Sequence, residues 1–139
     1  MKRRRAPFRL AIGGSLFAAV TAASAADYAV VLSESAARDP AWAAVASALE
    51  ARHGGPRVPW SGSVTNALPG LRKVLPRRAC FVARPDEVTR EYVAQVHQLT
   101  RALDADPWGD CQWGILTGFD ATNALATAQA PGPDRKSVV

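Results

Sequence analysis

The sequence is poor in the residues that build metal centres and redox sites, since its 139 residues include only two cysteines, two histidines and one methionine. Two cysteines are too few for the disulfide framework of a small secreted scaffold. The chain also has no Gly-x-Gly-x-x-Gly or P-loop motif, no His-Glu-x-x-His motif and no paired Cys-x-x-Cys motifs. We therefore expect neither a nucleotide cofactor nor a metal site.

Acidic residues are missing before Asp27, whereas five basic residues lie there: Lys2, Arg3, Arg4, Arg5 and Arg9. The other 12 basic residues equal the 12 acidic residues in number. The formal net charge of +5 therefore belongs to the start of the chain. A near-neutral remainder does not have the basic surface that nucleic acids require, so we expect no nucleic-acid partner.

Residues 1–25 have the three parts of an export signal. A basic segment is followed by a short apolar run at residues 10–22 and by the small-x-small site Ala23-Ser24-Ala25. The run is shorter than the about 20 residues that span a bilayer as a helix. We expect cleavage after Ala25, export to the periplasm or the exterior, and no stable membrane span afterwards; the alternative is an uncleaved anchor.

The other end of the chain, residues 131–139, carries no hydrophobic periodicity and is expected to be disordered. Residues 134–139 (DRKSVV) match the translation of a common sequencing-library adapter. We therefore expect that they are foreign to the natural protein, whose continuation is missing; the alternative is a natural short polar tail. Residues 26–130 then form a partial α/β domain.

Short apolar runs alternate with helical patterns through residues 26–130. The expected strands are residues 28–32, 57–60, 79–83 and 112–116, and the expected helices are capped by Asp39, Ser63, Asp86 and Asp120. Pro59 suits an edge strand, and Pro69-Gly70 should kink or split the second helix. This alternation predicts a parallel sheet of about four strands with helices on both faces.

Polar residues follow the expected strands, where ligands of open parallel sheets bind. The candidates for a ligand crevice are Ser33, Glu34, Arg84, Asp120 and Asn123. Capping and the first turn of a helix are the alternative roles of Asp120 and Asn123.

The cysteines and histidines are expected away from that crevice. Cys80 lies within a strand, and Cys111 precedes the next one. If these strands are neighbours, the two thiols can form a disulfide in an oxidising compartment; two free buried thiols are the alternative. His53 ends a helix and His97 lies within another, so the sequence predicts no catalytic residue.

Three segments carry a family resemblance: residues 80–91 (CFVARPDEVTRE), residues 92–97 and residues 113–121 (WGILTGFDA). They resemble the amino-terminal part of exported bacterial proteins related to gingipain-type, clan CD cysteine peptidases, over residues 27–128. The resemblance implies a caspase-like α/β sandwich and a Cys-His dyad that attacks peptide or protein substrates. In that family the His stands in a Gly-His-Gly context after a later strand, and the Cys follows the next strand.

Neither family pattern occurs here, because neither His53 nor His97 stands between two glycines and neither cysteine follows an expected strand. The resemblance therefore implies an incomplete gingipain-like sandwich that is inactive alone, with the missing C-terminal half of its own domain as its partner. Asp120 and Asn123 would then contribute to the substrate crevice. The alternative is a stand-alone periplasmic or extracellular binding or interaction module of flavodoxin-like architecture.

Overall fold

The computed structural model describes residues 26–105 and 111–131 of the chain. Its strands are β1 (Tyr28–Ser33), β2 (Arg57–Trp60), β3 (Arg78–Val82) and β4 (Gln112–Leu116). Its helices are α1 (Glu34–Arg38), α2 (Pro40–His53), the 3-10 helix η1 (Val64–Ala67), α3 (Leu68–Val74), α4 (Arg90–Arg101) and α5 (Ala121–Gln129). The expected signal peptide and the expected tail from residue 132 lie outside the described residues.

The four strands form one parallel sheet in the order β2-β1-β3-β4. The prediction of a four-stranded α/β fold is thus confirmed, and this order matches the first four strands of a flavodoxin-like sheet. The chain moves from β1 to one neighbour and then crosses to the other side for β3. The carboxyl ends of β1 and β3 therefore flank a topological switch point, where open sheets bind ligands.

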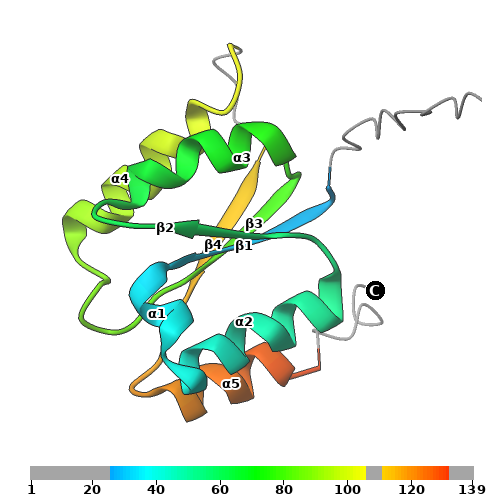
Figure 1. Cartoon of the computed structure of the whole chain (residues 1–139), viewed down its shortest axis with the longest axis vertical. Helices are drawn as coiled ribbons and strands as arrows, with labels where there is room; N and C mark the ends of the chain where they lie inside the picture. Colours follow the sequence, from blue (N-terminus) through cyan, green and yellow to red (C-terminus); the bar gives the residue numbers. More distant parts are fainter. Residues whose placement is uncertain (1–25, 106–110, 132–139) are drawn as a thin grey trace, which may run out of the picture.

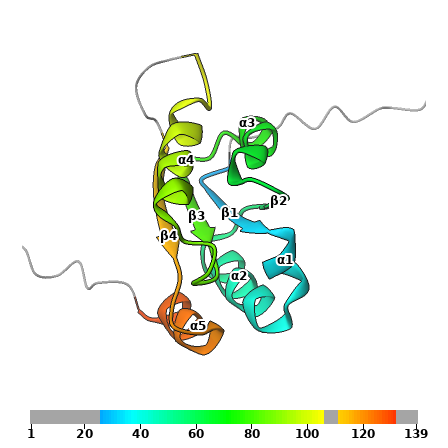
Figure 2. The same cartoon turned by 90° about the vertical axis from the view of Figure 1, so that its left-hand side faces the viewer.

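Helices cover both faces of the sheet, as expected (Figure 1). Helices α3 and α4 lie on one face, and α1, α2 and α5 lie on the other, an arrangement that the perpendicular view also shows (Figure 2). The central strand β1 is buried on both faces: Ala29 and Val31 belong to the core on the α3/α4 side, and Val30 and Leu32 to the core on the α2/α5 side. A strand that is covered by helices on both faces of the sheet needs apolar residues at consecutive positions, and β1 has them.

Capping residues set most helix boundaries where the sequence predicts them. The Asp39 side chain accepts a hydrogen bond from Ala41 N at the start of α2, and Gly54 ends that helix with a φ of 68°. The expected helix is split between Ala67 and Leu68 into η1 and α3, and Pro69 lies in the first turn of α3. Pro59 lies in the edge strand β2, as expected.

Two helix starts differ from the prediction. The third long helix, α4, begins at Arg90 with Thr89 as its N-cap, and not at Asp86. The preceding residues form a turn closed by a hydrogen bond from Glu87 N to Arg84 O. The short helix α1 was not expected, because five residues are too few to show a helical period.

Candidate functional site

The loop after β1 supplies the first two predicted crevice residues. Ser33 is 4% exposed and caps α1, since its Oγ accepts a hydrogen bond from Ala36 N at 3.0 Å. The same hydroxyl donates to Glu87 Oε1 at 2.5 Å. Glu34 lies in the first turn of α1 and forms an ion pair with Arg38 at 3.0 Å. Ser33 therefore faces the switch point, whereas the charge of Glu34 is balanced by its own helix.

Glu87 is the centre of the polar network at the switch point, and its side chain is only 12% exposed. Its Oε1 accepts hydrogen bonds from the hydroxyls of Ser33 and Ser35, and its Oε2 accepts one from Arg84 N at 2.9 Å. The Arg84 guanidinium lies 3.8 Å from the carboxylate and 3.6 Å from that of Asp86. One carboxylate thereby joins the carboxyl end of β1 to the turn after β3.

The other two predicted crevice residues belong to the start of α5. Asp120 Oδ1 accepts a hydrogen bond from Asn123 N at 2.8 Å, which is the capping role considered as the alternative. Asn123 Oδ1 packs against Gly118, where a Cβ would lie 2.6 Å away. Neither residue lines the hollows beside Glu87. Asp120 and Asn123 thus shape the end of β4 and do not join Ser33 and Arg84.

Trp60, at the end of β2, lines two hollows at this end of the sheet, as do Gly62 and Glu87. The first, of about 330 Å³, lies toward α1 and is lined by residues that include Ser33, Glu34, Arg38 and Ser61. The second, the Tyr92 hollow, has about 300 Å³ and is lined by residues that include Trp60, Ser63, Glu87, Glu91, Tyr92 and Gln95. Both are small for ligand pockets, which range from about 300 to 1,000 Å³.

Four buried side-chain atoms of the described residues have no hydrogen-bond partner: Trp60 Nε1, Arg84 Nε, Tyr92 OH and Thr117 Oγ1. All four belong to residues that end a strand, follow one or begin α4, so they lie at the carboxyl end of the sheet. Buried polar atoms are normally paired, so such a concentration marks this end as a site for a ligand or ordered water. The sequence alone did not indicate Trp60, Glu87 or Tyr92 as site residues. In the sequence, Trp60 has the pattern of an aromatic residue in an edge strand, Glu87 that of an acidic residue at the start of a helix, and Tyr92 that of a core residue.

The cysteines lie on opposite faces of the sheet, and both are free thiols. Cys80 packs against the core on the α2/α5 side, whereas Cys111 belongs to the core on the α3/α4 side. The strands β3 and β4 are neighbours, as the disulfide hypothesis required, but the sheet itself separates the two sulfurs. Burial raises the pKa of the Cys80 thiol and raises that of Cys111 to about 11, so neither is prepared to act as a nucleophile.

Neither histidine reaches the Glu87 network. His53 ends α2 and stacks on Tyr28 with ring centroids 4.4 Å apart. Desolvation of its ring, with smaller effects of Arg52 and Arg78, lowers the pKa of His53. His97 lies in α4 beside Trp113, with ring centroids 6.2 Å apart. The described residues therefore contain no Cys-His pair at the carboxyl end of the sheet.

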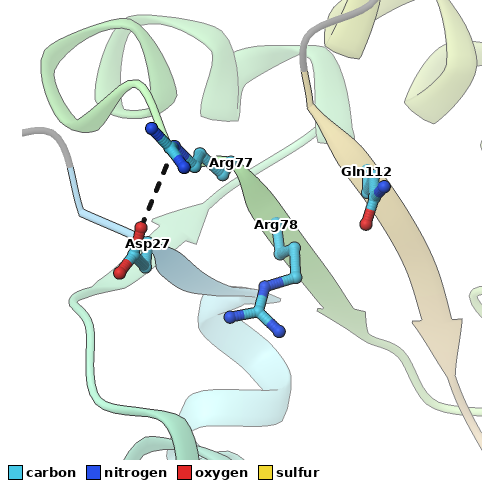
Figure 3. A pocket seen from close by; sticks show the side chains of 4 residues that line it. All are labelled: Asp27, Arg77, Arg78 and Gln112. Atoms are coloured by element: carbon cyan, nitrogen blue, oxygen red, sulfur yellow. Dashed lines mark ion pairs between the residues drawn. The ribbon is translucent and has the colours of Figure 1, made fainter.

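A further hollow lies at the opposite, amino-terminal end of the strands (Figure 3). It is lined by Asp27, Arg77, Arg78 and Gln112, and Arg77 Nε lies 4.0 Å from Asp27 Oδ1. Both side chains of this ion pair are largely exposed, so solvent screens their interaction. Open sheets do not bind ligands at this end as a rule.

The described residues contain no cluster of three or more His, Cys, Asp or Glu side chains that could hold a metal ion. In the same part of the chain, no helix has the length and apolar character needed to cross a bilayer. Comparison of the chain with family models, curated proteins and solved structures found no match.

Proposed function

We propose that this chain is the noncatalytic, N-terminal α/β subdomain of an exported gingipain-like cysteine peptidase. In that role it supplies the first strands of a larger sheet and part of the crevice that takes a peptide or protein substrate. The catalytic Cys and His would come from the C-terminal half of the same protein. The observation that carries this proposal is the outer edge of β4, on which no further strand of the described residues pairs.

The two edges of the sheet differ in how they are protected. At one edge, β2 has only four residues, includes Pro59 and carries Arg57, which forms an ion pair with Glu50. Short length, proline and charge are the usual means of blocking edge-to-edge pairing. At the other edge, β4 (QWGIL) has no charge and no proline, and Ile115 and Leu116 are half-buried. Phe119 follows it with 98% of its surface exposed.

This contrast supports a sheet that continues beyond β4. A flavodoxin-like order places a fifth strand next to β4. Such a strand would pair with the free N–H and C=O groups of β4 and would cover Phe119 and the half-buried residues.

A stand-alone exported binding module is the second candidate. The Glu87 network and the unpartnered atoms around it favour this alternative, because a ligand at the switch point needs no further strand. The two candidates differ in what must pair with β4.

Genomic sequencing past the codon of Pro133 tests the peptidase proposal. The proposal expects an open reading frame with a Gly-His-Gly strand end and a downstream Cys. A stop codon directly after Pro133 would contradict it.

Thermal unfolding of the purified chain gives an independent check. A sheet with an uncovered edge and apolar face should aggregate or unfold with poor cooperativity. A soluble monomer with a sharp two-state transition would instead support the binding module.

A further inference from the structure

The Tyr92 hollow combines two buried hydrogen-bond donors with an uncompensated negative charge. Trp60 and Tyr92 form its aromatic part, with ring centroids 6.0 Å apart. Tyr92 is only 5% exposed, and neither its hydroxyl nor Trp60 Nε1 has a hydrogen-bond partner in the described part of the chain. An indole N–H can only donate, so the missing group must offer an acceptor oxygen to Trp60.

The charges around this hollow restrict which acceptor fits. Of the residues that the structure describes, no arginine or lysine lines it, whereas Glu87 and Glu91 do. Glu87 is balanced by Arg84, but Glu91 forms no ion pair among the described residues and only accepts a hydrogen bond from Gln95 Nε2 at 3.1 Å. A carboxylate or phosphate would therefore be repelled, while a neutral carbonyl is acceptable and a cation near Glu91 is favoured.

The arrangement of these groups is fixed by neighbouring residues. Gln95 Oε1 accepts a hydrogen bond from Ser63 Oγ at 3.1 Å, which orients the Gln95 amide toward Glu91. Glu91 and Tyr92 both line this one small hollow, so a ligand that fills it and contacts both must carry its cation and its carbonyl within a short distance of each other. The volume of about 300 Å³ limits the buried part of that ligand to a small group.

We propose that the Tyr92 hollow binds a primary ammonium group that carries an adjacent carbonyl, the chemistry shared by an amino acid amide and the amino terminus of a peptide. The ammonium lies against Glu91, and the carbonyl oxygen accepts hydrogen bonds from Tyr92 OH and Trp60 Nε1. This site lies at the β2 side of the sheet and does not involve β4, so it exists whether or not the peptidase proposal holds.

Titration of the full chain with leucinamide, N-acetyl-leucinamide and leucine tests the ligand chemistry. Leucinamide should shift the indole N–H resonance of Trp60 in a saturable way, and loss of that resonance in Trp60→Phe assigns it among the four tryptophans. N-acetylation removes the positive charge, and leucine adds a carboxylate, so both should bind at least about tenfold more weakly. Equal or tighter binding of either compound, or no saturable shift with leucinamide, would overturn the proposal.

Two variants with matched controls test the protein side. Tyr92→Phe and Glu91→Gln should each weaken leucinamide binding about three- to tenfold, because each removes one interaction. Tyr28→Phe and Asp27→Asn make the same changes at the other end of the sheet and should leave binding unchanged. Unchanged affinity in Tyr92→Phe would overturn the assignment of its hydroxyl.

Ligand-observed saturation transfer supplies a readout that remains valid if the chain self-associates through β4. The same measurement on leucinamide and on leucyl-glycinamide distinguishes a small amino acid amide from a peptide amino terminus as the ligand. Tighter binding of leucyl-glycinamide assigns the site to peptide amino termini, and tighter binding of leucinamide assigns it to small amides. Failure of both compounds to receive saturation would contradict the site itself.

Discussion

Glu87 is the residue on which the carboxyl end of the sheet most depends. Its carboxylate, on a side chain that is only 12% exposed, accepts hydrogen bonds from Ser33 Oγ, Ser35 Oγ and Arg84 N. In Glu87→Gln the amide would point a donor at groups that are themselves donors, and Arg84 would lose an opposing charge. We expect the free energy of unfolding to fall by about 2 to 3 kcal/mol in chemical denaturation, since each charged hydrogen bond contributes about 1.5 to 3 kcal/mol.

The exposed Glu91 provides the control for that substitution. Glu91→Gln removes the same charge from a side chain with one hydrogen bond to Gln95, so its free energy of unfolding should change by less than about 0.5 kcal/mol. Equal stability of the two variants would show that the network at Glu87 does not hold β1 and the β3 turn together.

The two cysteines should react slowly while the chain is folded. A pKa raised from 9.0 to about 11 lowers the thiolate fraction of Cys111 at pH 8 by about 100-fold, and burial raises the pKa of Cys80 as well. Alkylation of Cys111 at pH 8 should thus be at least about 100-fold slower in the folded chain than in the unfolded chain, and should accelerate as the pH rises toward 11.

Mass mapping of the alkylated chain without reduction checks the pairing at the same time. We expect Cys80 and Cys111 to be recovered as separate thiols, because they lie on opposite faces of the sheet. Recovery of a cross-linked peptide, or rapid alkylation of the folded chain at pH 8, would contradict this arrangement.

At the scale of elements, α3 packs closely on β2 through a glycine. A Cβ at Gly70 would lie 2.7 Å from Val58 Cγ1, and the branched Val58 side chain has little freedom to move away. Gly70→Ala should lower the free energy of unfolding by about 1 to 3 kcal/mol through overpacking, although alanine favours a helix by about 1 kcal/mol. Chemical denaturation measures the net effect.

Gly114 in β4 is the matched control, because a Cβ there meets nothing within 4 Å. Gly114→Ala should therefore be neutral or stabilising. A Gly70→Ala variant that is at least as stable as the unsubstituted chain would contradict the close contact, and addition of Val58→Ala should restore part of the loss if the contact is its cause.

At the scale of the whole molecule, the uncovered β4 edge is expected to govern association. Gln112 and Phe119 are exposed at its two ends. The double variant Gln112→Lys/Phe119→Ser adds a charge at one end of this edge and removes an apolar side chain at the other. It should increase the monomer fraction measured by sedimentation velocity. The free energy of unfolding should change little, because neither side chain is buried.

Two variants separate the edge effect from other causes. Gln98→Lys adds the same charge on the exposed side of α4 and should not alter association. Phe81→Ala, at a fully buried position, should instead cost about 3 to 5 kcal/mol of stability. Equal association of the unsubstituted chain and the double variant would argue against β4 as the interface.

The sequence alone determined the layered α/β architecture. Local pattern is enough to place the strand β1, the caps Asp39 and Asp120, and the start of α3 just before Pro69. Each of these features depends on residues that are near one another in the chain. The sequence also placed Ser33 and Arg84 at one end of the sheet, because parallel strands share the direction of their carboxyl ends.

Only the tertiary structure decided which polar residues meet. Glu87 contacts Ser33 across 54 positions of sequence, and this contact depends on β1 and β3 being neighbours. Within residues 26–105 and 111–131, the same strand order leaves one edge of β4 without a neighbouring strand. It also groups Trp60 with Tyr92 and puts Cys80 and Cys111 on opposite faces. None of these contacts can be read from the local sequence, because strand order and the face that a residue occupies are set by how the whole chain packs.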